Sequence, residues 1–337
     1  MYYSSFTPSQ SFQTLFEVSW QKSASDLSSD HEVLLPFLMT QHLISTFITY
    51  LLILLGVAFF TLLERKALGY FQIRKGPNKL GIIGIPQPLA DALKLFVKEW
   101  ITPMSSNYFP FILTPTVMLI LALSLWQLFP SFMLSSQLTL GMLLFLCISS
   151  LTVYTTLMAG WSSNSKYALL GAVRAMAQTI SYEVTMTLII IFYLFLTMEM
   201  DMVSVRLANT SMIMMMLFLP LSVMWLAVIL AETNRAPFDF AEGESELVSG
   251  FNIEYGGAGF AFLFMAEYSN ILMMSLITSC LLTGTLILSI PVAIIFLWAR
   301  ATLPRYRYDL LMAMAWKSFL PLSLAILMAL SPLLFFL

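Results

Sequence analysis

The chain has 337 residues, of which 59% are apolar and only 10% are charged, and its formal net charge is −2. A soluble domain carries roughly 25% charged residues, so this composition excludes a soluble protein with a solvated surface. The high hydrophobicity also excludes a disordered chain and indicates a polytopic membrane protein.

The polar segment 1–42 precedes the first apolar stretch and is rich in Ser, Thr and Gln. It contains one basic residue, Lys22, against four acidic ones. A mitochondrial transit peptide would be basic and poor in acids, and a secretory signal would place its apolar stretch much earlier. We therefore expect 1–42 to be a polar N-terminal extension, loosely packed or disordered, ahead of a single membrane domain at 43–337.

The membrane domain is expected to be all-α. A transmembrane helix needs about 20 mostly apolar residues, and the sequence predicts eight of them, at 43–63, 110–130, 138–160, 177–198, 212–231, 260–282, 285–301 and 318–337. All basic residues except Lys22 and Arg206 then fall in loops on one side of the membrane. Basic loops face the inside, so both termini are predicted to lie on the opposite side.

The loop after the first span begins with the basic segment 64–79 and continues into the amphipathic segment 88–100. On a helix, 88–100 would place its large apolar side chains on one face and its charged ones on the other. This helix is too short to span a bilayer and is predicted to lie in the interface plane. Segment 64–79 admits two interpretations, a set of topology anchors or a basic entrance for a polar headgroup or an acidic partner.

The loop 232–255 concentrates six acidic residues around one base, Arg235. Its aromatic and aliphatic residues indicate that it folds back against the protein. If 239–247 were helical, Asp239, Glu242 and Glu246 would share a stripe. Such close carboxylates have raised pKa values and can exchange protons near neutral pH. A solvated acidic face remains the alternative interpretation.

Glu183 and Glu267 lie within the fourth and sixth predicted spans. An acidic residue at the centre of a membrane helix costs about 2.5–3.5 kcal/mol on insertion scales. Such residues usually mark a proton or ion path, although a neighbouring helix could also satisfy each carboxylate. Tyr182 and Tyr268 adjoin them and could donate hydrogen bonds.

The sequence offers few ligands for a metal or redox site. Cys147 and Cys280, the two cysteines, are far apart, and His31 and His42 lie near the N-terminus. Neither pair provides the ligands of an iron–sulfur cluster, and no nucleotide-binding motif is present. We expect that this chain binds no metal or cofactor and that any electrons arrive from another subunit.

Several long strings resemble the subunit-1 family of respiratory NADH:ubiquinone oxidoreductase, or complex I. They are LLERKALGYFQIRKGPNKLG, GWSSNSKYALLGAVRAMAQTISYE, LAETNRAPFDFAEGESELVSGFNIEY, FMAEY and RATLPRYRYDLLM. The resemblance covers about 43–337, and the acidic string is long and unusual. The polar head before the first span is longer than is typical of this family.

The resemblance implies a core membrane subunit that holds no complete catalytic site by itself. Ubiquinone would be the substrate, and FMN and the iron–sulfur clusters would lie in partner subunits. The proton or coupling path would comprise Glu183, Glu232, Asp239, Glu242, Glu244, Glu246, Glu254 and Glu267. The quinone chamber or its entrance would involve Arg65, Arg74, Asp91, Arg235, Phe264 and Arg300.

The resemblance also implies partners and a compartment. Partners would be the peripheral quinone-module subunits, small membrane-arm subunits and lipid, with no nucleic acid. The 23 methionines and the missing transit peptide favour a mitochondrially encoded chain in the inner membrane. Its termini would then face the intermembrane space, and its basic and acidic loops the matrix. Two alternatives remain at this point: a stand-alone proton-coupled transporter, and the equivalent subunit of a membrane-bound hydrogenase-like oxidoreductase.

Overall fold

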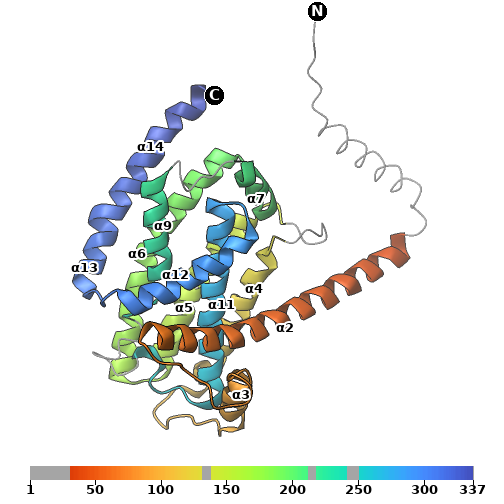
Figure 1. Cartoon of the computed structure of the whole chain (residues 1–337), viewed down its shortest axis with the longest axis vertical. Helices are drawn as coiled ribbons and strands as arrows, with labels where there is room; N and C mark the ends of the chain where they lie inside the picture. The colour runs from red at the N-terminus through yellow and green to blue at the C-terminus, as the bar shows by residue number, and fades with distance from the viewer. Residues whose placement is uncertain (1–30, 131–137, 212–217, 241–249, 337) are drawn as a thin grey trace, which may run out of the picture. The chain divides into compact units, whose positions relative to one another are not determined.

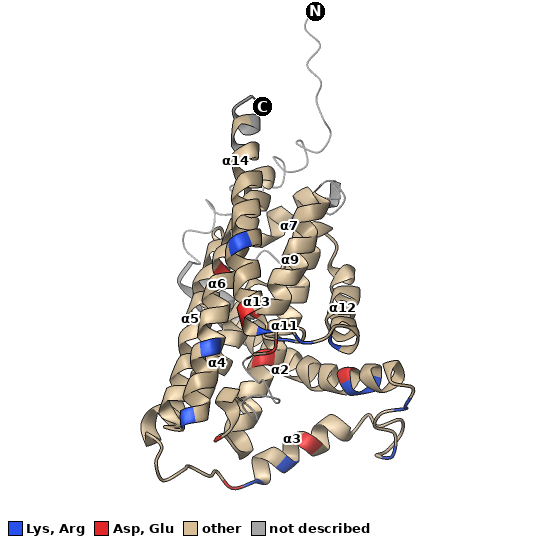
Figure 2. Cartoon of the chain, turned by 90° about the vertical axis from the view of Figure 1, so that its left-hand side faces the viewer, with Lys and Arg blue, Asp and Glu red and all other residues tan. Residues whose placement is uncertain are grey.

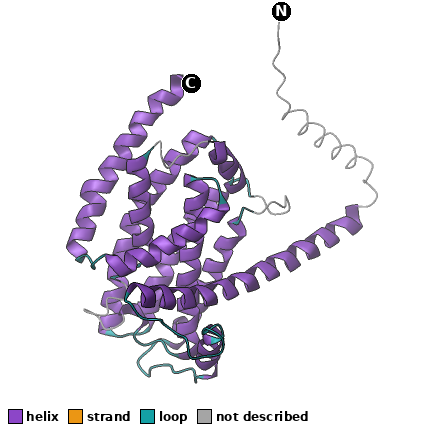
Figure 3. Ribbon diagram, in the orientation of Figure 1, coloured by secondary structure: helices purple, strands orange, loops and turns teal. Residues whose placement is uncertain are grey.

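A computed structural model describes residues 31–130, 138–211, 218–240 and 250–336. Within these ranges the chain is built from helices and connecting loops, without strands (Figure 3). The chain divides into two units, Met1–Thr49 and Tyr50–Leu337. The described part of the first unit is helical, and the sites described below lie in the second unit.

Among the described residues, six helices are long and apolar enough to cross a membrane, as expected of an all-α polytopic membrane protein. They overlap the first four, the sixth and the eighth predicted spans, although the fourth begins at Lys166 instead of 177 and the last covers Tyr308–Leu330 instead of 318–337. Their apolar ranges are Leu43–Phe71 in α2 (His31–Phe71), Tyr108–Leu128 in α4 (Tyr108–Leu125) and η1 (Trp126–Leu128), α5 (Gly141–Ser162), α6 (Lys166–Thr197), α11 (Gly257–Leu282) and Tyr308–Leu330.

The last of these ranges is not one uniform α-helix. It runs through α13 (Tyr308–Ala313), the π-helical turn η5 (Met314–Phe319) and α14 (Leu320–Phe336).

Two shorter apolar helices occupy the places of the fifth and seventh predicted spans. They are α9 (Leu219–Glu232), which begins after 212–217, a segment outside the described residues, and Leu286–Thr302, made of η4 (Leu286–Leu288) and α12 (Ser289–Thr302). Neither reaches the usual length of a spanning helix. The total of eight spans therefore stays a prediction.

Three further short elements complete the described chain: α3 (Gln87–Val97), α7 (Met202–Ser211) and η3 (Gly250–Asn252). Helix α3 begins one residue before the predicted amphipathic segment 88–100 and ends three residues before its end, since the backbone is extended at Lys98. It lies against α11, where the rings of Phe96 and Phe262 are 6.1 Å apart. Its position in a membrane interface stays a prediction.

Helices α5, α6 and α11 carry more buried residues than the other described helices, and Figure 1 shows where they lie in the chain. The first two approach closely at Gly160, where an added Cβ would clash with Cβ of Ala172. Small residues allow such close packing of apolar helices. Figure 2 shows how few charged residues interrupt this bundle, and that several lie on the C-terminal part of α2 and on α3.

Candidate functional site

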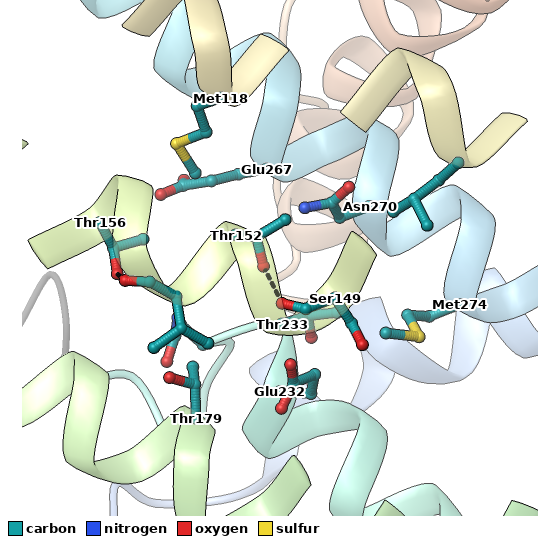
Figure 4. Close-up of a pocket in the computed structure, with 13 residues that line it drawn as sticks. Met118, Ser149, Thr152, Thr156, Thr179, Glu232, Thr233, Glu267, Asn270 and Met274 are labelled. Atoms are coloured by element: carbon teal, nitrogen blue, oxygen red, sulfur yellow. Dashed lines mark hydrogen bonds between the residues drawn. The ribbon is translucent and has the colours of Figure 1, made fainter. Parts of the chain in front are cut away.

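A polar cavity lies between α4, α5, α6 and α11 and the C-terminal end of α9 (Figure 4). Two carboxylates reach it from different helices, Glu232 from the end of α9 and Glu267 from α11. Its lining consists of Met118, Leu125, Ser149, Thr152, Val153, Thr156, Thr179, Glu232, Thr233, Asn234, Glu267, Asn270 and Met274.

One wall of this cavity is a row of hydroxyl groups on α5. Ser149, Thr152 and Thr156 are spaced by three and four residues, which places them on one helix face. Each donates its hydroxyl proton to the backbone carbonyl three residues earlier, at 2.7–2.9 Å. A hydroxyl oxygen keeps lone pairs when it donates, so this wall offers acceptors to water in a polar cavity.

The acidic residues predicted for the path are partly brought together. Glu232 and Glu267 share the cavity, and Glu183 on α6 is close enough to Glu232 to interact with it electrostatically. Glu254 is half-buried in the loop before α11. The predicted path residues Glu242, Glu244 and Glu246 lie outside the described residues.

A charged cluster forms around Glu64 near the C-terminal end of α2. Oε1 of this buried carboxylate lies 3.1 Å from Nη1 of Arg235 and also pairs with Nη1 of Arg300. The guanidinium carbon of Arg235 sits 4.3 Å from the ring centroid of Tyr268, a cation–π contact. Burial disfavours its charge, yet Glu64 and Tyr268 raise the pKa of Arg235 above its ordinary value, so the guanidinium stays protonated.

The turn after α9 separates two cavities. Glu232, Thr233 and Asn234 line the polar cavity, whereas Arg235 lines a second one together with Glu64 and Arg300. Asn234 has a φ of 49°, in the left-handed region that asparagine tolerates better than most residues. Four consecutive residues thus place a carboxylate in one cavity and a guanidinium in the other.

The first part of the acidic loop folds back against the protein, as its aromatic residues predicted. Phe238 and Phe240 are buried, and their rings lie 5.4 and 5.9 Å from those of Tyr306 and Tyr308. Asp239, between them, accepts from Arg305 at 3.3 Å.

The remaining chamber residues are not gathered in one place. Arg65 pairs with Asp91 on α3 at 2.7 Å, and both are partly exposed. Arg74 is exposed in the turn after α2, where its backbone N–H donates to the carbonyl of Gly69. Phe264 lies between Phe260 and Tyr268 on α11. Two separate pairs of the predicted set thus come together: Arg65 with Asp91 and, through Glu64, Arg235 with Arg300.

Three site residues were missed by the sequence analysis. Glu64 was hidden because it directly precedes Arg65 and Lys66, which look like topology anchors; an acid at the end of an apolar span was the available signal. Arg305 lies far from Asp239 in sequence, so its role followed only from tertiary contact. Asn270 follows Glu267 by three residues, and helical spacing could have placed it on the same face.

Comparisons with known proteins show which family this chain is similar to. Residues 44–331 match the family described as NADH dehydrogenase. NADH-ubiquinone oxidoreductase chain 1 of Heterololigo bleekeri is 52% identical over 302 residues, which cover 86% of this chain and 96% of that relative. The chain 1 proteins of Anopheles quadrimaculatus and Lampetra fluviatilis are 54% and 50% identical, over 84% of this chain and 92% and 93% of their own lengths.

Proposed function

Because this chain belongs to the NADH dehydrogenase family, as the match over 44–331 and the relatives at about 50% identity establish, we propose that it builds a quinone chamber together with peripheral subunits and begins a proton or coupling path. It is a core membrane subunit of NADH:ubiquinone oxidoreductase and a multi-pass protein of the mitochondrial inner membrane. Ubiquinone is the substrate of that enzyme. The family favours the respiratory enzyme over a stand-alone transporter or a hydrogenase-like subunit.

The finer topology belongs to the proposal. Eight helices cross the membrane, with α9 and the helix Leu286–Thr302 as the two short ones. Both termini face the intermembrane space, the basic and acidic loops face the matrix, and α3 lies in the interface. Partner subunits in the peripheral arm hold the FMN and the iron–sulfur clusters, and small membrane-arm subunits and lipid contact this chain.

The observation that carries the proposal is the turn 232–235, which adjoins both cavities. Glu232 and Glu267 supply carboxylates to a polar cavity inside the bundle. Arg235, one residue beyond that cavity, is held by Glu64 and Tyr268. A change of charge near Arg235 therefore changes the electrostatic potential at Glu232, a few residues away. The low dielectric of the interior strengthens this effect.

Electrostatic coupling follows from this arrangement. Reduction of a quinone adds electrons whose negative charge protons must neutralise. Arg235 and Arg300 supply positive charge beside the proposed chamber, and the acids behind them take up or release protons in response. The row Ser149, Thr152 and Thr156 accepts hydrogen bonds from water that connects these acids.

The test uses the assembled enzyme in membranes, with Glu232→Gln and Glu267→Gln as variants. Each removes a titratable proton from the cavity while keeping the side-chain shape. We expect NADH–ubiquinone turnover and proton pumping to fall by about tenfold, equivalent to about 1.4 kcal/mol of activation free energy. NADH oxidation by ferricyanide should be unchanged, because it bypasses the membrane arm.

Glu199→Gln is the matched control, since Glu199 is exposed just beyond the end of α6. It should leave both activities within twofold of the parent. Parental turnover and pumping in both cavity variants would overturn the proposed path.

A further inference from the structure

Gln178 is a fully buried amide on α6, which packs against α9 (Figure 1). Its Nε2 atom donates to two backbone carbonyls, those of Ala231 and Phe238, each at 2.8 Å. An amide NH₂ group has two protons, and both are used here. Oε1 of Gln178 is buried and has no hydrogen-bond partner in the described part of the chain, so these two bonds fix the amide.

The two carbonyls bracket the turn that carries the proposed coupling residues. Ala231 directly precedes Glu232, and Phe238 directly precedes Asp239. Between them lie Thr233 and Asn234, which line the polar cavity, and Arg235, which lines the second one. One side chain thus holds both ends of a segment that faces two cavities.

The turn also contacts other segments, but each of those contacts holds one residue. Its local backbone bonds run back to the end of α9 and to the carbonyl of Arg235. The side chain of Arg235 pairs with Glu64, and the backbone N–H of Tyr306 donates to the carbonyl of Pro237 at 3.1 Å. Gln178 differs from these contacts because one side chain bonds both ends of the turn from a different helix.

We propose that Gln178 is a positioning residue that fixes Glu232 relative to Arg235, and so couples the two cavities. This inference rests on the proposed function, because it concerns residues that the coupling path uses. Gln178 does not act on protons itself. It keeps the carboxylate and the guanidinium at a constant separation, so that a charge change at one is felt at the other.

The chain contains a matched control for a buried amide of the same kind. Asn209 on α7 is also buried, its Nδ2 atom donates to the carbonyls of Cys280 and Leu281 at 3.0 Å, and its Oδ1 atom has no hydrogen-bond partner among described residues. Neither it nor its partners line the two cavities. Loss of this amide has a similar structural cost without touching the turn 232–235.

The experiment compares Gln178→Met with Asn209→Leu in the assembled enzyme. Each variant removes the donor from two buried carbonyls. We expect Gln178→Met to lower the kcat of NADH–ubiquinone turnover about tenfold, equivalent to about 1.4 kcal/mol, with KM for the quinone and ferricyanide activity within twofold. Asn209→Leu should leave all three within twofold, and equal effects of the two variants would overturn the inference.

A double-mutant cycle separates positioning from general stability. Because Gln178 is proposed to act through the turn that carries Glu232, the effects of Gln178→Met and Glu232→Gln should be non-additive. Additive effects would assign Gln178 a purely structural role and overturn the inference. If Gln178→Met does not assemble, Gln178→Glu, which keeps the side-chain length, takes its place in the same cycle.

Failure of the inference is distinguishable from failure of the proposed function. Parental turnover and pumping in both Glu232→Gln and Glu267→Gln would reject the path itself. A strong effect of Glu232→Gln combined with a parental Gln178→Met would keep the path and reject the role of Gln178.

Discussion

Nη1 of Arg235 lies 3.1 Å from Oε1 of Glu64, although 171 residues separate them in the sequence. Arg300 shares the same carboxylate oxygen from a third element. One buried acid thus joins the end of α2, the turn after α9 and the end of α12.

Glu64→Gln should weaken the enzyme strongly. It removes the charge that compensates Arg235, whose side chain is 14% exposed, and breaking a buried pair by removing one partner costs about 3–5 kcal/mol. We expect lower amounts of assembled complex on native gels and at least a tenfold loss of quinone-linked turnover, about 1.4 kcal/mol or more.

The control for Glu64→Gln is Asp309→Asn. Asp309 pairs with Arg307 at 3.0 Å, but both side chains are more than 70% exposed. Exposed pairs contribute about 0–1 kcal/mol, so assembly and turnover should remain near parental values. Parental behaviour of Glu64→Gln as well would show that the cluster has no role in stability or turnover.

Asp239 and Arg305 should show weak coupling. Their side chains are 13% and 34% exposed, so solvent screens the pair and reduces its contribution to about 0.2–1 kcal/mol. A double-mutant cycle with Asp239→Asn and Arg305→Gln, read from thermal inactivation of the complex, measures this value. A coupling above about 3 kcal/mol would place the pair in the class of buried ion pairs.

Tyr255→Phe removes a hydroxyl that contacts Thr114 and Ser162 at 3.0 and 3.1 Å and donates to the carbonyl of Ala159 at 3.2 Å. The ring keeps its stacking on Phe111, at 4.3 Å between centroids. We expect a loss of about 1–3 kcal/mol, because buried polar partners are left unpaired. Thermal unfolding of the complex measures it.

Alkaline pH gives a second readout for Tyr255. Burial raises the pKa of its phenol above the usual 10, so the folded state favours the protonated form. The native state then binds more protons than the unfolded state above about pH 10, and stability falls as pH rises there. Above about pH 10, Tyr255→Phe should therefore lose less stability than the parent as pH rises. Below about pH 9, the stability of both should change with pH in the same way.

Gly160→Ala should disturb the packing of α5 on α6. The added methyl group would clash with Cβ of Ala172 and lie 2.8 Å from the carbonyl oxygen of Ala168. Overpacking of this kind costs about 1–3 kcal/mol, which a lower thermal-inactivation temperature would reveal. Gly56→Ala is the control, since nothing lies within 4 Å of its added Cβ, and equal behaviour of both variants would contradict the argument.

The sequence by itself determined the fold class and most of the helices. Charge is scarce, and apolar stretches of about 20 residues have one stable form in lipid, because every backbone polar group must bond within its own helix. It also indicated Glu183 and Glu267, since an acid inside an apolar stretch stands out. The predicted fifth and seventh spans agree less well with the short helices α9 and α12, because local hydropathy does not fix where a short helix begins.

Only the tertiary structure decided which charges meet. Glu64, Arg235 and Arg300 come from distant segments, and no periodicity connects them. Arg65 and Asp91, both predicted for the chamber, pair with each other at a partly exposed position. Gln178 looks like any polar residue in a helix until its amide is seen between two carbonyls. Hydrogen bonds and ion pairs act over about 3–4 Å, so they follow from packing in space rather than from order along the chain.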